Sequence, residues 1–434
     1  MNRPAAAILL TGNELLRGVI ADQNGSHLAA SLERHGFVVR RTLVVGDALD
    51  DIERGLRELM DQAELVVSSG GLGPTHDDRT VEALSNVAGV DLVLDADVLE
   101  RIDRWTDQVA VRYGLDRAGF DAGNRKQAHV PAGAAVLGMA GTAPGLILPV
   151  DGSVVVVLPG VPSELRRLWD DAPGHRALAD VFARAQPRAR WLIRTYGIGE
   201  SHVADIHRSA GGDPPGIETS ICARSFEIEI DIRADPGHEQ AGEAFAAEMR
   251  AELGGHVFST DERPLAEIVL DLLRSRGWTG ATAESCTGGM VAAALTAVAG
   301  SSEAFTGGVV AYSNALKRDM LSVPESLLDE HGAVSAEVAA AMASGARARL
   351  GADAAVSITG IAGPGGGTEQ KPVGLVHLHV SSPAGEDARR MDIPGTDRIG
   401  GARVSNSEMV IAAMRHHRRK ARRTQNAFAN QYML

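Results

Sequence analysis

Short apolar runs that end in small-residue turns alternate with amphipathic segments, and this alternation limits the possible folds more than any other feature. Residues 5–10 form such a run and end at Thr11-Gly12, and residues 65–69 run into the glycine-rich segment 70–75. Between them, apolar residues recur at helical spacing from 52 to 59. Strands that alternate with helices predict a doubly wound parallel sheet. Ligands of such sheets bind beyond the carboxyl ends of the strands, so we expect both turns on the functional rim.

Composition limits the class of protein further. The chain has 434 residues, which predicts two to three domains. Its net charge of −13 disfavours nucleic acid as a partner. The two cysteines, Cys222 and Cys286, are far apart, which suits a reducing compartment without disulfides. Since no apolar run approaches membrane-spanning length, we expect a cytoplasmic protein with no membrane contact.

The second half contains a strand, a turn and a helix in direct succession. An apolar run, 278–283, leads into the turn 284–289, and a small-residue helix pattern, 290–298, follows. Such a turn aims backbone N–H groups and the positive end of a helix dipole at one spot. The same spot receives three candidate nucleophiles. They are Ser285, Cys286 and Thr287. The alternative interpretation is a capped helix start with glycines for close packing.

Lys317 is the candidate base for this turn. A hydroxyl is a poor nucleophile until a base removes its proton. The expected strand 305–313 ends beside Tyr312 and four residues before Lys317. A lysine in water, with a pKa of about 10.4, is too protonated to act, but burial or a nearby positive charge lowers that pKa. Ser285, Lys317 and Tyr312 therefore form a workable set for acyl transfer. Two alternatives stay open: Lys317 as a solvated surface charge, and Cys286 as the nucleophile.

Five segments of this half together resemble the C-terminal domain of the CinA family. They are residues 283–289, 309–317, 331–335, 359–367 and 371–374. Members of that family hydrolyse nicotinamide mononucleotide to nicotinic acid mononucleotide and release ammonia, without a cofactor. The resemblance implies Ser285 as nucleophile, Lys317 as its base and Tyr312 as helper. It also implies that Thr359 and Gly360 lie near the substrate.

Further substrate contacts are expected in the same half. The N–H groups of Thr287, Gly288 and Gly289 would stabilise either the oxyanion or the substrate phosphate. Asp397-Arg398 resembles a pair that precedes the last helix of the family, and Arg398 would neutralise the phosphate.

The glycine-rich turn of the first half predicts a phosphate site. Gly70, Gly71 and Gly73 give a phosphate access to backbone amides, with Thr75 beside them. Four carboxylates follow this turn or the first strand, and they suit a hard divalent cation such as Mg, Mn or Co. They are Asp77, Asp78, Glu14 and Asp22. Together these residues predict a metal-assisted pyrophosphate site, and the alternative is that Asp77 or Asp78 caps the next helix.

This half resembles the molybdopterin-binding-like N-terminal domain of the same CinA proteins. The matching residues are Gly12, Glu14-Leu15-Leu16, Gly18, Asp22, Asn24, Val45-Gly46-Asp47, 70–75, Asp77-Asp78, Thr80, 124–127, 141–145 and 158–164. Relatives hydrolyse ADP-ribose at its pyrophosphate with a divalent metal. The alternative is a domain that only binds a nucleotide or pterin, in a competence or DNA-damage protein that acts with the recombination machinery.

The sequence thus predicts an α/β protein of three parts and a tail. Residues 1–170 are expected to form the molybdopterin-binding-like doubly wound sheet, and residues 259–415 the C-terminal α/β amidohydrolase domain. Residues 171–258 contain an alternating strand and a helix pattern, which predicts a small α+β module that serves as a spacer or in homodimerisation. Residues 416–434 form a basic tail that we expect to be disordered.

Overall fold

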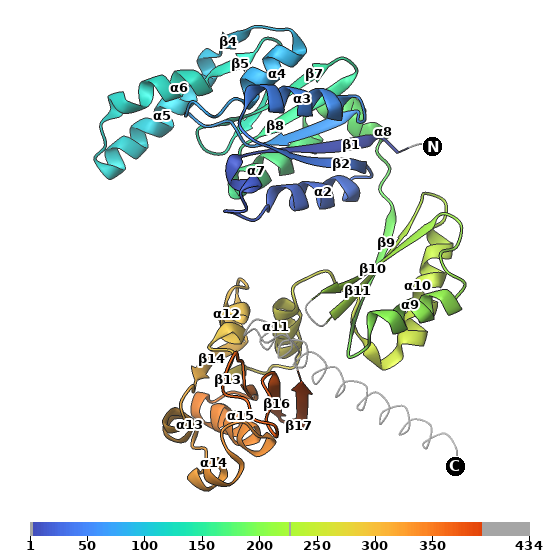
Figure 1. Ribbon diagram of the computed structural model, residues 1–434, viewed down its shortest axis with the longest axis vertical. Coiled ribbons are helices and arrows are strands. Elements are labelled where there is room, and N and C mark those ends of the chain that lie inside the picture. Colours follow the sequence, from blue (N-terminus) through green and yellow to red (C-terminus); the bar gives the residue numbers. More distant parts are fainter. Residues whose placement is uncertain (1–2, 225–226, 393–434) are drawn as a thin grey trace. The chain divides into compact units, whose positions relative to one another are not determined.

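The computed structural model describes residues 3–224 and 227–392 (Figure 1). The chain divides into two compact units, Met1–Arg188 and Ala189–Leu434. The predicted tail 416–434 and Arg398 lie outside the described residues. Across the described ranges, no helix has both the length and the apolar character needed to cross a membrane.

A six-stranded sheet forms the centre of the first unit, in the order β2-β1-β3-β8-β7-β6. The strands are β1 (Ala5–Thr11), β2 (Val38–Val45), β3 (Leu65–Ser69), β6 (Ala135–Met139), β7 (Pro144–Val150) and β8 (Ser153–Leu158). β1 pairs in parallel with β2 and β3, and β3 pairs in parallel with β8. The α/β prediction is confirmed. The hairpin of β6 and β7 adds an antiparallel edge that the sequence analysis did not predict.

Helices cover both faces of this sheet (Figure 1). The helices are α1 (Asn13–Leu16), α2 (Asn24–Arg34), α3 (Leu49–Met60), α4 (Thr80–Ala88), α5 (Ala96–Tyr113), α6 (Asp121–Gln127), α7 (Pro162–Asp171) and α8 (Ala179–Arg184), and the short pair β4 (Leu92–Leu94) and β5 (His129–Pro131) lies beside them. Leu28 of α2 and Trp169 of α7 are buried on one face. Ile52 and Leu56 of α3 are buried on the other, so α3 buries the apolar stripe that the sequence predicted.

The first unit continues past α7. Leu178 and Val181 are buried in the same core cluster as Trp169. The expected boundary between residues 170 and 171 therefore falls inside this unit, which ends at residue 188.

The second unit begins with a four-stranded antiparallel sheet, in the order β10-β11-β9-β12. Its elements are β9 (Ala189–Tyr196), α9 (Glu200–Ser209), β10 (Ile217–Arg224), β11 (Glu227–Ala234), α10 (Glu239–Leu253) and β12 (Val257–Ser259). Ile228, Ile230 and Ile232 of β11 are buried in one cluster with Phe245 and Met249 of α10. The alternation of apolar and charged residues along β11 thus arises because helices cover only one face of this sheet. The sequence predicted such a half-buried strand.

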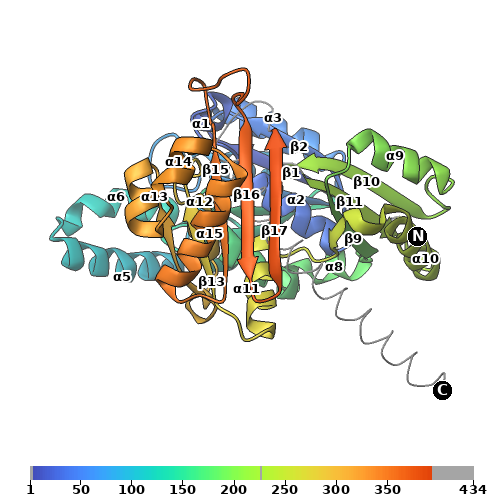
Figure 2. The same cartoon turned by 90° about the horizontal axis from the view of Figure 1, so that it is seen from below.

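The remainder of the second unit contains a five-stranded sheet, in the order β14-β13-β15-β16-β17. Its elements are α11 (Leu265–Ser275), β13 (Gly280–Glu284), α12 (Met290–Thr296), β14 (Phe305–Val310), α13 (Asn314–Leu321), α14 (Glu325–His331), α15 (Ala336–Leu350), β15 (Ala354–Gly360), β16 (Leu375–Ser382) and β17 (Gly385–Asp392). β13 pairs in parallel with β14 and β15, whereas β16 and β17 are antiparallel. Helices α13, α14 and α15 cover one face (Figure 2), and α11 and α12 cover the other.

Helix α15 approaches α13 very closely because its contact residue is a glycine. A Cβ atom at Gly345 would lie 1.9 Å from the carbonyl oxygen of Leu321, the last residue of α13. Leu321 is also buried against Val338 and Met342 of α15. The small residue therefore sets the distance between α15 and the helix that carries Lys317.

We predict that Gly345→Ala destabilises the protein, because the new methyl group collides with backbone rather than with a movable side chain. Overpacking of this kind costs about 1–3 kcal/mol or more. Thermal unfolding measures the effect. Gly255→Ala is the matched control, since a Cβ there meets no atom within 4 Å. Equal unfolding temperatures for the two variants would contradict the close approach of α13 and α15.

Candidate active site

The turn after β13 is held between the two neighbouring strands. The N–H of Ser285 donates to the carbonyl of Ile358 on β15, at 2.9 Å. The N–H of Ala311, just beyond β14, donates to the carbonyl of Glu284, at 2.8 Å. Ser285 therefore lies at the carboxyl edge of three parallel strands, where α/β sheets bind their ligands.

Two glycines are required by the shape of this turn. Gly288 has a φ of 62° and Gly289 a φ of 99°, and both angles lie in the left-handed region. A residue with a Cβ atom is strained there. The Gly-Gly pair thus lets the chain turn from β13 into α12 within a few residues.

The structure brings Ser285 and Lys317 together. Lys317 lies in α13, after the N-cap Ser313, whose hydroxyl accepts the N–H of Leu316 as capping residues do. The Lys317 Nζ is 3.0 Å from the Ser285 Oγ, and the two side chains are 1 % and 7 % exposed. Lys317 is therefore not the solvated surface charge that the sequence left open.

Burial favours the neutral form of the Lys317 amine. Its Nζ donates to the carbonyl of Ala311 at 2.9 Å and to that of Tyr312 at 3.4 Å. Loss of hydration lowers the pKa of Lys317, and Cys286, when ionised, would act in the opposite direction. A neutral amine has two N–H groups and one lone pair. The two carbonyls can take the N–H groups, which leaves the lone pair to accept the Ser285 proton.

The environment of Cys286 raises the pKa of its thiol, whereas that of an activated cysteine lowers it. It is 7 % exposed, and burial raises its pKa to about 11, with a further contribution from the charge of Glu284. Reactive cysteines have a lowered pKa, so the raised pKa of Cys286 disfavours its thiolate at neutral pH. Ser285, rather than Cys286, is the nucleophile that the geometry favours.

The N–H groups of the turn are unequally available. Gly288 donates to the carbonyl of Ser285 at 3.2 Å, and Gly289 donates to the carboxylate of Glu284 at 3.0 Å. The hydroxyl of Thr287 also donates to that carboxylate, at 2.7 Å. Within the described residues, no oxygen atom accepts the N–H of Cys286 or Thr287. Both N–H groups lie near the Cys286 sulfur, whose ionised form they would favour, and they differ in this from those of Gly288 and Gly289, which donate to oxygen atoms of the turn.

Three residues that the sequence indicated near this turn differ in their contacts. They are Thr359, Gly360 and Tyr312. The Thr359 hydroxyl is buried and donates to the carbonyl of Ala333 at 2.7 Å, so it braces the start of α15. A Cβ at Gly360 would lie 3.1 Å from the Cys286 sulfur, which shows how closely β15 approaches the turn. The Tyr312 side chain is 60 % exposed, and the carbonyl of Tyr312 is the part that contacts Lys317.

The glycine-rich turn of the first unit is closely packed at each predicted glycine. A Cβ at Gly70 would lie 2.4 Å from the Thr11 carbonyl oxygen, and one at Gly71 2.2 Å from the Thr80 hydroxyl. At Gly73 it would lie 2.3 Å from the carboxylate of Asp78. Only glycine fits these positions, so the turn brings its backbone close to the ends of β1 and β3.

Two residues that we did not assign to a site hold this turn in place. The Lys126 amine donates to the carbonyls of Gly73, at 3.3 Å, of Asp78, at 2.6 Å, and of Thr75. The side-chain amide of Gln127 donates to the Leu72 carbonyl at 2.9 Å. Both belong to the segment 124–127, which matches the family, but nothing in the local pattern showed that they contact residues 48 to 55 positions earlier in the chain.

Most of the predicted metal ligands are engaged with the chain itself. Asp22 accepts the N–H groups of Asn24 and Gly25, each at 2.9 Å, and so caps α2. Asp78 accepts the N–H of Thr75 at 3.0 Å and its hydroxyl at 2.6 Å. The Thr75 hydroxyl also contacts Asp77. Asp77 and Asp78 do not cap α4, whose N-cap is Arg79 without a side-chain hydrogen bond, so the capping alternative is wrong for both. Their carboxylates instead hold the loop at Thr75.

Glu14 and Asp22 line a different cavity from Asp78. The first cavity has a volume of about 70 Å³ and also contains Asn24, Ser69 and Gly160. The second has a volume of about 190 Å³, and Gly71, Gly73, Asp78 and Lys126 line it. Within the described ranges, no group of three or more His, Cys, Asp or Glu side chains is placed to hold a metal ion.

Asp47 marks the place where negative charge gathers on this rim. Burial raises its pKa, and the charges of Glu14, Asp77 and Asp78 add to the effect. Its carboxylate accepts the N–H of Asn13 at 3.1 Å. Acidic side chains therefore lie near one another at this edge of the sheet, although they do not converge on one point.

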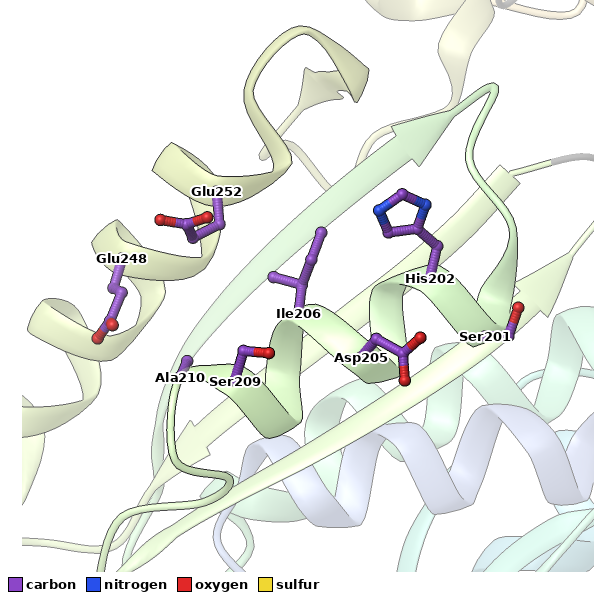
Figure 3. A pocket seen from close by; sticks show the side chains of 8 residues that line it. All are labelled: Ser201, His202, Asp205, Ile206, Ser209, Ala210, Glu248 and Glu252. Atoms are coloured by element: carbon purple, nitrogen blue, oxygen red, sulfur yellow. The ribbon is translucent and has the colours of Figure 1, made fainter.

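A third pocket, of about 570 Å³, lies between α9 and α10. Its lining is Ser201, His202, Asp205, Ile206, Ser209, Ala210, Glu248 and Glu252. Figure 3 shows Ser201, His202, Asp205, Ile206, Ser209 and Ala210 along α9 and at its end, with Glu248 and Glu252 on the neighbouring α10. None of the residues that the sequence indicated for catalysis or binding lies in this pocket.

Two family models match the chain. The CinA C-terminal domain matches residues 262–418, and the probable molybdopterin binding domain matches residues 7–173. The first range contains Ser285 and Lys317, and the second contains the glycine-rich turn.

Relatives match over nearly the full length. The CinA-like protein of Mycolicibacterium vanbaalenii is 44 % identical over 422 residues, which cover 96 % of this chain and 98 % of that one. The CinA-like protein of Mycolicibacterium paratuberculosis is 43 % identical over 407 residues, 90 % of this chain and 93 % of the other. The crystal structure of CinA from Thermoplasma acidophilum is 38 % identical and covers 42 % of this chain and 99 % of its own, with a TM-score of 0.36. Because relatives this similar extend over almost all of the sequence, the chain belongs to the CinA family.

Proposed function

We propose that the second unit is an amidohydrolase that converts nicotinamide mononucleotide to nicotinic acid mononucleotide and ammonia. One observation carries the proposal: a buried lysine amine whose pKa is lowered lies 3.0 Å from a serine hydroxyl at the mouth of a strand–turn–helix. The substrate class comes from the family resemblance. A Ser/Lys pair can cleave an amide without metal or cofactor, because the amine supplies both base and acid.

In the proposed reaction, the Ser285 Oγ attacks the carboxamide carbon while its proton moves to the Lys317 Nζ. We assign the N–H groups of Cys286 and Thr287, which no described oxygen accepts, to the oxyanion, because in other hydrolases the N–H of the residue after the nucleophile serves this role. The protonated Lys317 then gives its proton to the leaving nitrogen, so that ammonia departs and an ester remains on Ser285. Water, deprotonated by the same amine, hydrolyses the ester and restores the serine.

For the first unit we propose a phosphate-binding site at residues 70–75, with ADP-ribose as the family-implied ligand. In the part of the chain that the structure describes, no group accepts the N–H groups of Gly71, Leu72 or Gly73, and successive free N–H groups bind anions. Lys126 adds a positive charge to the same cavity, and burial lowers the pKa of its amine. Because the nearby carboxylates do not form a three-ligand set, we derive no step through a metal.

The first prediction concerns the nucleophile and its base. Ser285→Ala and Lys317→Met should each lower ammonia release from nicotinamide mononucleotide by about a thousandfold or more, because such groups act as a unit. Lys317→Met keeps the apolar stem of the side chain and so protects the core. Ammonia is measured by a coupled assay, with thermal unfolding as the check on folding.

Cys286→Ala is the matched control for this experiment. The thiol is buried and protonated, so its removal should leave activity within about tenfold of the wild type, an effect of packing only. Loss of activity in Cys286→Ala together with full activity in Ser285→Ala would contradict the assignment and favour the thiol.

The second prediction concerns pH. Only the neutral amine can accept the serine proton, so kcat/KM should rise with pH as Lys317 loses its proton and fall as pH drops through that pKa. Burial lowers this pKa, so the midpoint of the rise should lie below the value of about 10.4 for lysine in water. A pH profile of kcat/KM tests this, with circular dichroism at each pH. A midpoint at or above the ordinary lysine value would show that the amine is solvated.

The third prediction concerns the first unit. Lys126→Met removes the donor to three carbonyls of the glycine turn and should weaken ADP-ribose binding by about tenfold, measured by calorimetry. Arg125→Met is the control, because it removes one positive charge from the same helix. Release of AMP with Mg, Mn or Co would favour the pyrophosphatase, and binding without release the binding-only alternative. Equal affinity in Lys126→Met and the wild type would contradict a ligand at this turn.

A further inference from the structure

Glu284 is a fully buried carboxylate that the proposed mechanism does not use. It is the last residue of β13 and is 0 % exposed. Its Oε2 accepts the Thr287 hydroxyl at 2.7 Å and the N–H groups of Gly289 at 3.0 Å and Val291 at 3.1 Å. Its Oε1 accepts the N–H of Ala292 at 2.8 Å. Glu284 lies at the start of the turn that contains Ser285, and its side chain thus binds the end of that turn and the start of α12.

Burial of a carboxylate is expensive unless strong donors surround it. Here three donors are backbone N–H groups at the start of α12, where the helix dipole also favours a negative charge. Hydrogen bonds to a charged acceptor are about twice as strong as neutral ones. The arrangement therefore fixes the turn more firmly than a neutral cap would.

The main chain of Glu284 is connected to the other partner of the catalytic contact. Its carbonyl accepts the N–H of Ala311, and the carbonyl of Ala311 accepts the Lys317 amine at 2.9 Å. The side chain holds the turn that follows Ser285, and the main chain holds the residue that orients Lys317. Both atoms of the 3.0 Å contact thus depend on residue 284.

We propose that Glu284 is a positioning residue, which holds the Ser285 hydroxyl in line with the Lys317 amine by binding the first N–H groups of α12 and the Thr287 hydroxyl. This inference rests on the proposed serine–lysine chemistry, but it does not depend on which amide is the substrate. Glu284 also opposes ionisation of the neighbouring Cys286, whose thiol it helps to keep protonated. The same carboxylate therefore positions the Ser285 hydroxyl and disfavours the thiolate of Cys286, the other candidate nucleophile.

The competing explanation is that Glu284 only stabilises the fold. The two roles differ in what they do to the reacting groups. A purely stabilising carboxylate changes the unfolding temperature and leaves the folded site unchanged. A positioning carboxylate controls the reactivity of Ser285 and the hydration of Lys317 in the folded protein, since a displacement of about 1 Å can cost a hundredfold in rate.

The experiment compares Glu284→Gln with Asp353→Asn. Asp353 is a matched control, because its carboxylate accepts the N–H of Thr279 at 2.8 Å and the Thr279 hydroxyl at 3.1 Å, just before the opposite end of β13. Three quantities are measured in full-length protein: the rate at which a fluorophosphonate labels Ser285, the pH midpoint of kcat/KM, and the unfolding temperature.

We expect Glu284→Gln to slow labelling and kcat by about a hundredfold, with KM within about threefold of the wild type. Its kcat/KM midpoint should move to higher pH, because a loosened turn admits water to Lys317 and reduces the effect of burial. Asp353→Asn should lower only the unfolding temperature. If Glu284→Gln labels at the wild-type rate with an unchanged pH midpoint, Glu284 is a structural cap and the inference is overturned.

Thr287→Val covers the case in which Glu284→Gln does not fold. It removes one of the four donors and keeps the carboxylate, so labelling should slow by about threefold to tenfold in a folded protein. Wild-type labelling in Thr287→Val would then count against the inference. A wild type that labels at Ser285 but releases no ammonia refutes the proposed substrate and leaves the inference standing. A wild type that does neither overturns both.

Discussion

The removal of the Lys317 amine from water is the physical condition on which the second unit's chemistry depends. An ammonium group is strongly hydrated, and burial lowers the pKa of the Lys317 amine, which has no carboxylate partner among the described residues. Alanines at positions 283 and 311 and the glycine at 345 leave room for α13 and α15 to pack tightly around it. The small residues of this core therefore support the proposed mechanism, since bulkier residues would keep α13 and its lysine farther from the turn.

The turn beside Lys317 presents a serine and a cysteine at adjacent positions, and their environments differ. Ser285 is anchored through its N–H to β15 and faces the amine. Cys286 lies against Gly360 in an apolar cluster, where burial and the charge of Glu284 both disfavour a thiolate. In the proposed mechanism the intrinsically weaker nucleophile, Ser285, reacts because it is the one with a base within hydrogen-bond distance.

The first unit uses the same architectural position for a different purpose. Its glycine-rich turn also follows a parallel strand, and tight contacts with Thr11, Thr80 and Asp78 explain each glycine. The hydroxyl of this turn, that of Thr75, donates to the carboxylates of Asp77 and Asp78 and not to a buried amine. Instead, a lysine from α6 holds the turn by its carbonyls, which leaves N–H groups for an anion. The two units therefore place backbone donors at strand ends, and only the second adds a base.

The sequence by itself determined the α/β class and the strand–turn–helix at residues 278–298, because these follow from local periodicity. It also indicated Ser285 and Lys317, through motifs that resemble a family. Only the tertiary structure decided that these residues, thirty-two positions apart, lie in contact and away from water. The roles of Glu284 and Lys126, and the antiparallel strands β6, β7 and β17, were likewise invisible, since hydrogen bonds and desolvation depend on which distant segments pack together.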